Sequence, residues 1–430
     1  MAPDALAQLM AGRFRDPEDG APLPAPVRTV VIEDSLAGRE GELVAALNLG
    51  GRLAVVSDPT TRAVLGSRVE QALDRIAETL SIVLPEHPEP DLDTVDRLRE
   101  AASGASALIA IGSGTINDLC KYAAAEAGLP FAVFATAPSM NGYTSINAAI
   151  TVRGHKRSLA ARLPAAVFFD LEILAAAPVR LIRAGLGDCL CRPTAQADWL
   201  LAHLLLGRPY RQAPFALLAA DEAPLLAASA KLVAGDLDAI RRLVRTLALS
   251  GFGMTLCGGS EPASQGEHLI SHYGDMLGDP AWARAFHGEQ IGVATLTMAR
   301  LQAEMLEGPP PQIEASQVDE ASLIRHFGPE LGHSCWQEFR NKRVDPGAAI
   351  QLNHRISERW DEIRTRIGAI HKPARELCAV LERAGAPTTP EALGWPGRFY
   401  QQAVRHARLI RNRYTFLDLA ADAGRSDLLG

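Results

Sequence analysis

The first 140 residues alternate short apolar runs with longer segments in which apolar positions recur at helical spacing. Apolar runs bounded by turn-forming residues predict buried strands. They fall at 27–34, 52–58, 81–86, 106–114 and 130–139. The segments between them predict helices, one of which is closed by Gly104. Strands that alternate with helices of this length indicate a parallel sheet with helices on both faces.

Beyond about residue 180 the pattern changes. Long segments rich in Ala, Leu and Arg repeat their apolar positions every three to four residues, which predicts helices; they cover 181–207, 214–253, 264–277, 286–306, 353–383 and 397–422. Strand patterns nearly vanish, and the proline-rich stretch at 307–316 predicts a surface loop. We therefore expect an α/β Rossmann-like parallel-sheet domain over residues 1–180 and an all-α domain over residues 181–430.

Composition and charge argue against several classes of protein. The 430 residues are 47% hydrophobic and 22% charged, which fits a globular protein of two domains. A net charge of −7 with no long basic run argues against nucleic acid as a partner. No apolar stretch reaches the length of a membrane span, and the N-terminus lacks the apolar core of a signal peptide. The six cysteines are scattered, so we expect a reduced, cytoplasmic protein without a disulfide framework.

A glycine-containing junction predicts a phosphate site. Gly112 and Gly114 lie where the strand at 106–114 meets the following helix, in "AIGSGTINDL". Glycine lets the backbone approach a phosphate closely, and the helix N-terminus offers free amides and a positive dipole end. Asn117 stands where the full dinucleotide motif has its third glycine. A plain tight turn between strand and helix explains the same residues.

Asp58 ends the second predicted strand, in "AVVSDPTT". An acidic residue at this point of a dinucleotide-binding sheet can bind a ribose hydroxyl, while Arg62 one turn later could meet the 2′-phosphate of NADP. The alternative is an Asp-Pro turn that only stops the strand. The residues alone do not decide between these two interpretations of Asp58, and they do not decide whether the cofactor is NAD or NADP.

Candidate metal ligands lie in the second half of the chain. His268 and His272 are four residues apart in "SQGEHLISHYGDM" and therefore share one helix face. Glu267 precedes the pair, so this is not the H-E-x-x-H arrangement of metalloproteases. With Asp188 and His287, two imidazoles and a carboxylate could hold a divalent metal and leave positions open for catalysis. Alternatively, Asp188 is a helix N-cap and His287 a buried histidine bonded to a backbone carbonyl.

Five motifs occur together in order: GSGTIND, TAPSMNGYTS, GLGD, GEHLISH and HGEQIGVAT. In this order they resemble the sn-glycerol-1-phosphate dehydrogenase family, within the iron-containing alcohol dehydrogenase and dehydroquinate synthase superfamily. The resemblance covers about residues 28–300, and HARLIRNRYTFLDLA resembles the family's closing segment. It implies a dehydroquinate synthase-like fold, with a nucleotide-binding α/β domain and a helical domain that binds metal and substrate.

The resemblance also implies roles for single residues. The metal ligands fall on Asp188, His268 and His287, and the substrate contacts on Asn141, Asp188 and His272. The NAD or NADP contacts fall on the following positions: Asp58, Gly114, Thr115, Ile116, Asn117, Asp118, Thr136, Ala137, Pro138, Ser139 and Ser145. His272 is the candidate for positioning the substrate oxygen or relaying its proton, because the unperturbed pKa of histidine lies near neutrality.

The implied reaction is metal-dependent hydride transfer between NAD(P)H and a small ketone. Dihydroxyacetone phosphate would be reduced to an alcohol such as sn-glycerol 1-phosphate. The resemblance favours zinc or nickel, with iron also compatible with this ligand set, and a homo-oligomer. Lys156, Arg157 and Arg192 are basic candidates for binding a substrate phosphate, although each also fits ordinary surface charge.

One position departs from the family pattern. Asn141 stands where the family usually has an aspartate that contacts the substrate. Asparagine keeps the size, loses the charge and adds an NH₂ donor, so a substrate group that is negative or accepts hydrogen bonds would be better received. Two other functions stay open: a sugar-phosphate cyclase (a lyase) like dehydroquinate synthase, and a non-catalytic nucleotide-binding protein.

Overall fold

The computed structural model describes residues 4–429, which divide into two compact units. The sheet unit comprises residues 4–152, Arg157–Cys189 and Gln212–Ser260. The helical unit comprises Arg153–Lys156, Leu190–Arg211 and residues 261–429.

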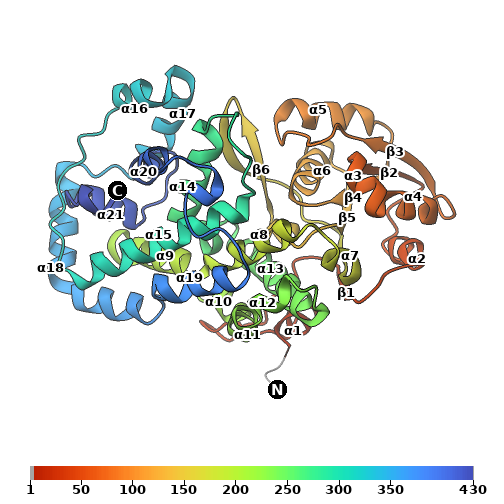
Figure 1. The fold of residues 1–430 in the computed structure, drawn as a ribbon, viewed down its shortest axis with the longest axis horizontal. Helices are drawn as coiled ribbons and strands as arrows, with labels where there is room; N and C mark the ends of the chain where they lie inside the picture. Colours follow the sequence, from red (N-terminus) through yellow and green to blue (C-terminus); the bar gives the residue numbers. More distant parts are fainter. Residues whose placement is uncertain (1–3, 430) are drawn as a thin grey trace. The chain divides into compact units, whose positions relative to one another are not determined.

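The sheet unit is built on six parallel strands in the order β1-β8-β5-β4-β2-β3 (Figure 1). Their bounds are β1 Thr29–Glu33, β2 Arg52–Ser57, β3 Glu78–Val83, β4 Ala107–Gly112, β5 Phe131–Ala135 and β8 Ala166–Asp170. Every residue of β4, β5 and β8 is buried, which is why these strands, apart from Asp170 at the end of β8, are apolar and do not alternate. The predicted parallel sheet is confirmed.

Helices cover both faces of this sheet. One face packs on α2 and α4 through a core that includes Val44, Val69 and Val55, and α6 packs on β4 from the other side (Figure 1). The helices around the sheet are α1 Ala5–Met10, α2 Glu40–Ala45, α3 Pro59–Thr61, the π-helix Arg62–Gly66, α4 Ser67–Leu73, α5 Leu92–Ala101, α6 Gly114–Ala127, α7 Leu171–Ala175 and α8 Val179–Leu190. The unit ends with α10 Ala213–Leu218, α11 Glu222–Ala227, α12 Ser229–Leu232 and α13 Leu237–Cys257.

Two further strands, β6 Asn147–Val152 and β7 His155–Ala160, pair in a small separate sheet. Arg153 and Gly154 join them, both with positive φ, as the tight turn of a two-residue hairpin requires. The apolar pattern of the sequence predicts neither this pair nor β8. In the sheet, β8 lies between β1 and β5, so a strand missing from the prediction is central to the fold.

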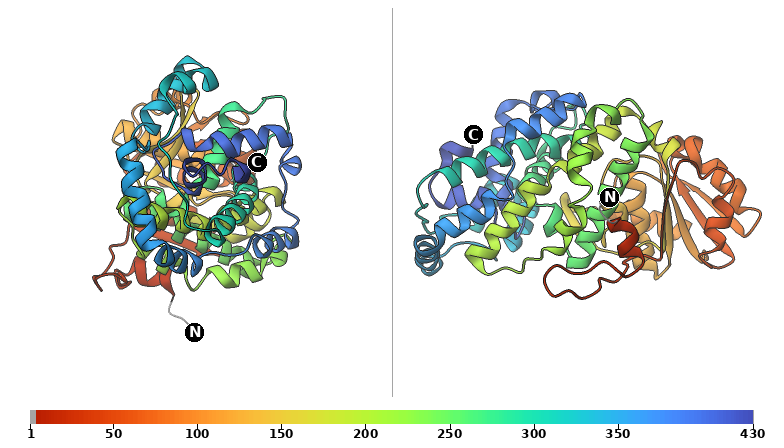
Figure 2. Two further views of the ribbon diagram at one scale, coloured as in Figure 1. Left: turned by 90° about the vertical axis from the view of Figure 1, so that its left-hand side faces the viewer. Right: turned by 90° about the horizontal axis from the view of Figure 1, so that it is seen from below.

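The helical unit contains α9 Arg192–Leu206, α14 Gly266–Leu277, α15 His287–Glu307, α16 Glu320–Phe327, α17 Pro329–Phe339, α18 Pro346–Gly368, α19 Ala374–Arg383, α20 Gly397–His406 and α21 Phe416–Asp422 (Figure 2). Their apolar stripes form one core, to which Leu201, Ile270, Met298, Trp360 and Leu417 belong. The helical character predicted beyond residue 180 is found, but the predicted segments 181–207, 214–253, 353–383 and 397–422 each contain more than one helix. Residues 308–316 contain no helix or strand, close to the predicted loop, and α16 and α17 were not predicted.

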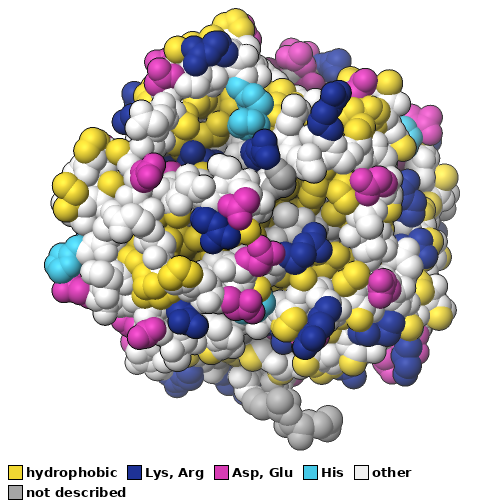
Figure 3. Space-filling view, turned by 60° about the vertical axis from the view of Figure 1, so that its left-hand side comes forward, with side chains coloured by type: hydrophobic (Ala, Val, Ile, Leu, Met, Phe, Trp, Pro, Cys, Tyr) yellow, Lys and Arg dark blue, Asp and Glu magenta, His cyan; other side chains and the backbone are white. Residues whose placement is uncertain are grey.

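One face of the molecule carries charges of both signs. On the face drawn in Figure 3, acidic and basic side chains are interspersed among hydrophobic ones. Among residues 4–429, none of the helices combines the length and the apolar character that crossing a bilayer requires.

The compact units do not follow a single division at residue 180. Gln212–Ser260, which the sequence pattern groups with the C-terminal helices, belongs to the sheet unit. In that unit α13 packs against α7 and α10. The division into 1–180 and 181–430 therefore stays a prediction about domains, and helical content alone does not decide which unit a segment joins.

Candidate functional site

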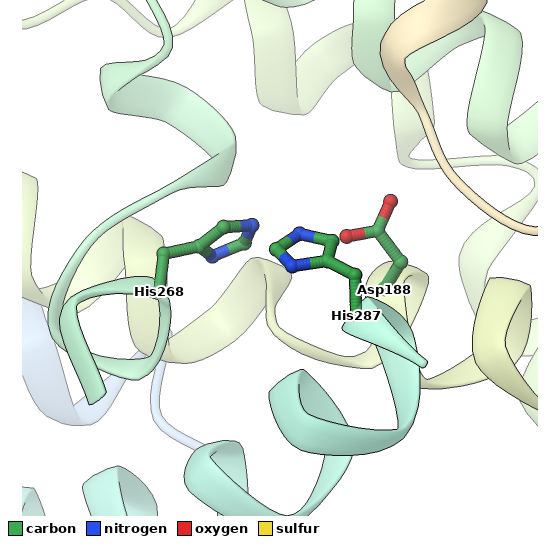
Figure 4. A group of neighbouring side chains, drawn as sticks. All are labelled: Asp188, His268 and His287. Carbon is green, nitrogen blue, oxygen red and sulfur yellow. The ribbon is translucent and has the colours of Figure 1, made fainter. Parts of the chain in front are cut away.

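Two packed helices of the helical unit bring three histidines together. His268 and His272 come from α14, and His287 is the first residue of α15. The ring centroids of His268 and His287 are 5.1 Å apart, and His272 lies 5.9 Å from His287 and 6.2 Å from His268. Figure 4 shows the His268 and His287 rings pointing toward one another. The shared helix face predicted for His268 and His272 is confirmed, and His287 joins it from the neighbouring helix.

Glu267 orients the His268 ring. Its Oε1 lies 2.9 Å from His268 Nδ1, and this carboxylate is completely buried. The backbone N–H of Gln265 and the hydroxyl of Thr194 also donate to Glu267, at 2.8 Å and 3.3 Å. Because acceptors on Nδ1 direct Nε2 of a histidine toward a metal, the arrangement suits a ligand histidine with an orienting carboxylate.

A second set of possible ligands overlaps the first. Donor atoms of Cys191, Glu267 and His268 lie within 4.8 Å of one another. Cys191 Sγ donates to the backbone oxygen of Ala263 at 3.7 Å, and Glu267 accepts the hydrogen bonds described above. Cys191 and Glu267 therefore both have hydrogen-bond partners within the helical unit, and only Glu267 bonds directly to His268.

Burial and nearby cations favour the neutral forms of His272 and His287. Burial is the main reason why the pKa of His272 lies well below its usual range, and Arg411, His287, His268 and Lys156 lower it further. The pKa of His287 is lowered well below its usual range by burial and then by His268, Lys156 and Arg411. Neutral imidazoles carry the lone pair that a metal requires. The same shift weakens the expectation that His272 holds a proton near neutrality.

Asp188 lies in the sheet unit, at the end of α8. Its Oδ2 accepts a hydrogen bond from the backbone N–H of Asn141 at 2.8 Å. Asp188 is only 2% exposed, and it lies inside a helix, so the N-cap alternative is wrong. The amide side chain of Asn141 donates to Ser250 Oγ at 3.2 Å. Asn141 therefore holds Asp188 through its backbone, while its side chain is oriented by α13.

Two helical glycines let the loop after β5 pack closely against α8 and α13. A Cβ on Gly185 of α8 would lie 1.8 Å from the backbone oxygen of Pro138. A Cβ on Gly251 of α13 would lie 2.1 Å from Thr144 Oγ1 and 2.5 Å from the backbone oxygen of Asn141. Both separations are far below contact distance, so these helices can hold the loop only where glycine stands.

The predicted nucleotide residues gather at one edge of the sheet. Asp58 follows β2, and Ser113 and Gly114 follow β4, the strand paired with β2. The chain runs outward from β2 to β3 and returns to β4 on the other side of β2. Such a reversal of strand order leaves a crevice beyond the carboxyl ends, where doubly wound sheets bind ligands.

Hydrogen bonds hold the loop after β5 and the first turn of α6 in place, and Tyr143 Oη lies 3.5 Å from the backbone oxygen of Gly112 at the end of β4. Tyr143 donates to the backbone oxygen of Ala137 at 2.7 Å, and the buried Asn117 donates to Asp118 Oδ1 at 2.9 Å. Asp118 Oδ2 in turn accepts from the backbone of Ala149. The remaining predicted contacts lie in the first turn of α6 or on this loop; they are Thr115, Ile116, Thr136, Ser139 and Ser145.

Asp58 has a structural role that the sequence left open. Its Oδ1 accepts from the backbone N–H of Thr61 at 2.7 Å, which makes it the N-cap of α3. Arg62 pairs with Glu70, with Nη2 and Oε2 3.0 Å apart. The turn explains why an aspartate stands there, and contact with a ribose stays a prediction.

The basic residues that were candidates for binding a substrate phosphate lie in different surroundings. Lys156 and Arg411 both act on the histidine cluster, and an Arg411 guanidinium N–H donates to the backbone oxygen of Lys156 at 3.3 Å. Arg192 donates to Gln196 within α9 at 2.6 Å, and Arg157 lies in the sheet unit on β7. Arg411 was not predicted from the sequence, although it lies in the closing segment HARLIRNRYTFLDLA that carries part of the resemblance.

Comparisons with known proteins bear on what this arrangement does. Residues 31–178 match the family model described as iron-containing alcohol dehydrogenase. Glycerol-1-phosphate dehydrogenase [NAD(P)+] of Methanosarcina acetivorans is 30% identical over 401 residues, which is 91% of this chain and 90% of that protein. The protein of the same name from Pyrococcus horikoshii is 36% identical over 276 residues, or 64% of this chain and 78% of that one.

Solved structures share the fold. Glycerol dehydrogenase from Schizosaccharomyces pombe aligns with a TM-score of 0.63 at 17% identity, covering 94% of this chain and 90% of that one. A probable glycerol dehydrogenase from Sinorhizobium meliloti aligns with a TM-score of 0.60 at 18% identity, covering 94% and 97%. At this level of identity the likeness concerns the fold alone, and it confirms the predicted α/β unit followed by helices.

Proposed function

The chain belongs to the glycerol-1-phosphate dehydrogenase family of the iron-containing alcohol dehydrogenases, and from this premise we propose that it transfers a hydride between NAD(P)H and a small phosphorylated ketone. The ketone is dihydroxyacetone phosphate, and the product is sn-glycerol 1-phosphate. The observation that carries the proposal is the pair His268 and His287, with ring centroids 5.1 Å apart and each Nδ1 within hydrogen-bond distance of a side chain.

Asp188, drawn with these two histidines in Figure 4, is the third ligand in this proposal. Two imidazoles and one carboxylate form a ligand set that zinc, nickel and iron(II) all accept, with positions left open for substrate. A divalent metal held by these three residues would supply Lewis-acid stabilisation of negative charge on the substrate oxygen. The fit rests on the chemistry of the donors and on the neutral form of His287, which burial favours by lowering the pKa of its ring.

Asn141 and His272 receive the substrate. Asn141 offers an amide beside Asp188, whose carboxylate its own backbone holds. His272 is buried, and among the described residues its Nδ1 has no hydrogen-bond partner, so a substrate hydroxyl would satisfy it. Because its pKa is held low, His272 acts as a neutral hydrogen-bonding group that orients the substrate oxygen.

The dinucleotide binds at the carboxyl ends of β2, β4 and β5 in this proposal. Ser113, the N-cap of α6, makes no side-chain capping bond to the first turn, and glycine follows at Gly114. Helix N-termini of this kind favour the pyrophosphate of a dinucleotide. The loop from Thr136 to Ser145 lies next to it, because β4 and β5 are paired neighbours.

Substitution of each proposed ligand tests the function. Asp188→Ala, His268→Ala and His287→Ala should each lose stoichiometric metal by elemental analysis and also lose oxidation of NADH or NADPH by dihydroxyacetone phosphate. His354→Ala is a matched control, because this exposed histidine of α18 lies beside Glu358. A ligand variant that keeps both metal and turnover removes that residue from the site.

The same assay separates the alternatives. A sugar-phosphate cyclase would release phosphate from its substrate with no net change in NADH absorbance. A non-catalytic protein would bind NAD and turn over none of a panel of phosphorylated and unphosphorylated ketones. Either result with the metal-loaded wild-type protein contradicts the dehydrogenase proposal.

A further inference from the structure

A chain of hydrogen bonds ends on the ring of His287. Ser271 Oγ lies 3.3 Å from His287 Nδ1 and donates to Gln290 Oε1 at 2.5 Å. The amide nitrogen of Gln290 donates to Asp275 Oδ1 at 3.2 Å and to the backbone oxygen of Ala285 at 3.4 Å. Ser271 and Asp275 are one turn apart on α14, and His287 and Gln290 are three residues apart on α15.

The positions of the protons along this series of hydrogen bonds follow from the two acceptors, Asp275 and the backbone oxygen of Ala285, at its far end. A carboxylate and a backbone carbonyl can only accept, so the NH₂ of Gln290 must face Asp275 and Ala285. Its Oε1 then faces Ser271 and takes the single hydroxyl proton of that residue. Ser271 is left to accept from His287, which places the imidazole proton on Nδ1 and the lone pair on Nε2.

We propose that Ser271 and Gln290 are positioning residues that select the Nδ1-protonated tautomer of His287, so that Nε2 is presented as a metal ligand. The inference rests on the proposed metal site and adds two residues to it. Ser271 is completely buried and Gln290 is 6% exposed, so water does not readily replace either partner. Glu267 does the same for His268 through a direct bond, so both imidazoles present Nε2.

Gln290 determines which group donates and which accepts along these hydrogen bonds. Without its acceptor oxygen, the Ser271 hydroxyl could rotate and donate to His287 Nδ1, which would put the ring proton on Nε2 and block the ligand. Gln290→Met keeps the length and removes both polar atoms, and Ser271→Ala removes the link itself. Loss of such an outer partner typically weakens metal affinity by about 10- to 100-fold.

The experiment measures zinc affinity of the full chain by competition with a chromophoric chelator. Gln290→Met and Ser271→Ala should bind Zn²⁺ about 10- to 100-fold more weakly than wild type, and Ser271→Thr, which keeps the hydroxyl, should restore most of the affinity. Gln302→Met is the matched control. Gln302 is also a buried glutamine of α15, but its amide donates to Thr194 and Asp198. It should lower stability and leave zinc affinity unchanged.

A second readout does not depend on metal. The ¹⁵N shifts of the imidazole nitrogens, assigned by comparison with His287→Gln, should report protonated Nδ1 at position 287 in wild type and a change of tautomer in Gln290→Met. Unchanged zinc affinity and unchanged shifts in Gln290→Met would overturn the relay alone. Failure of wild type to bind zinc would overturn the proposed metal site instead, and the tautomer would still be measurable.

Discussion

The ammonium group of Lys121 donates a hydrogen bond to the backbone oxygen of Ser145 at 2.9 Å. It also donates to the backbone oxygens of Gly142 and Asn147. Lys121 is completely buried on α6, and this burial lowers its pKa to about 8 although Asp118 opposes the shift. One side chain therefore fastens the loop that carries the proposed nucleotide and substrate contacts to the helix that begins at Gly114.

Lys121→Met should loosen that loop. The backbone oxygens of Gly142 and Asn147 also accept from the Ser145 hydroxyl, so the variant deprives chiefly the backbone oxygen of Ser145 of its donor. A buried carbonyl without a donor costs about 1–3 kcal/mol, and we expect a loss of about that size in the free energy of unfolding. We also expect KM for NADH to rise about tenfold or more, equivalent to about 1.4 kcal/mol of lost binding. Urea unfolding and steady-state kinetics measure the two effects. Lys231→Met, which alters an exposed lysine of α12, should change neither. Equal unfolding and equal KM in Lys121→Met would refute this role.

The apolar pattern predicts the sheet well where strands are buried on both faces. β4 and β5 consist of nearly uninterrupted apolar residues, because helices cover them on both sides. β8 is equally buried and as long as β5, but the helix α7 follows it directly, and periodicity alone does not distinguish a short apolar run from part of a buried helix. β7 contains Lys156 and Arg157, and such polar residues give no alternation that would have marked a strand.

The candidate site, like the sheet, could be predicted from the sequence only in part. The spacing of His268 and His272 predicts a shared helix face, but no periodicity links them to His287, which packs beside them only because α14 and α15 are neighbours. The resemblance to a family supplied that link. Ser271 and Gln290 lay inside the quoted motifs and went unnoticed, because a hydrogen-bond relay depends on side-chain orientation that the sequence does not reveal.

The preference for NADH or NADPH should depend on Glu70. Arg62 is the cation nearest to Asp58 in sequence that could meet a 2′-phosphate, but it pairs with Glu70, which also accepts from Ser81. With Arg62 paired and Asp58 negative, we expect the wild type to prefer NADH. Glu70→Gln should raise kcat/KM with NADPH relative to NADH by several-fold.

Glu78→Gln is the control for this change. Glu78 is an exposed glutamate of β3 that pairs with Arg52 at the opposite end of the same strands. It should leave the ratio of the two cofactors unchanged. A wild type that prefers NADPH, or a Glu70→Gln variant with an unaltered ratio, would show that Arg62 does not read the 2′ position.

Asn141→Asp should narrow the range of substrates. The backbone bond to Asp188 is kept, but the NH₂ group that donates to Ser250 is replaced by a second negative charge beside Asp188. Dihydroxyacetone phosphate and 3-phosphohydroxypyruvate differ at one end, where the second compound carries a carboxylate in place of the hydroxymethyl group. We expect Asn141→Asp to lower kcat/KM for the carboxylate compound relative to dihydroxyacetone phosphate by about tenfold or more, since like charges repel.

Ser250→Ala separates orientation from charge. It removes the hydroxyl that accepts from the Asn141 amide without adding charge. It should reduce turnover of both ketones by similar factors. An unchanged ratio of the two ketones in Asn141→Asp would show that this position does not determine specificity.

A buried acid at the base of α14 should make stability depend on pH. Asp198 is completely buried; it accepts from the backbone N–H groups of Gly266 and Phe416 and from the amide of Gln302. These donors favour the charged form, but burial outweighs them, and with the nearby Glu267 it raises the pKa of Asp198 to about 8. In the unfolded chain the same group loses its proton near its ordinary pKa of 3.8.

The raised pKa of Asp198 determines whether stability rises or falls with pH. Between about pH 4 and pH 8 the folded protein keeps a proton that the unfolded chain has released, so stability falls as pH rises through this window, by up to about 1.4 kcal/mol per pH unit from this group. Asp198→Asn cannot ionise, so its free energy of unfolding should fall less steeply than that of wild type between pH 5 and pH 8. Urea unfolding at several pH values measures both slopes, and parallel slopes would show that Asp198 is already ionised in the folded protein.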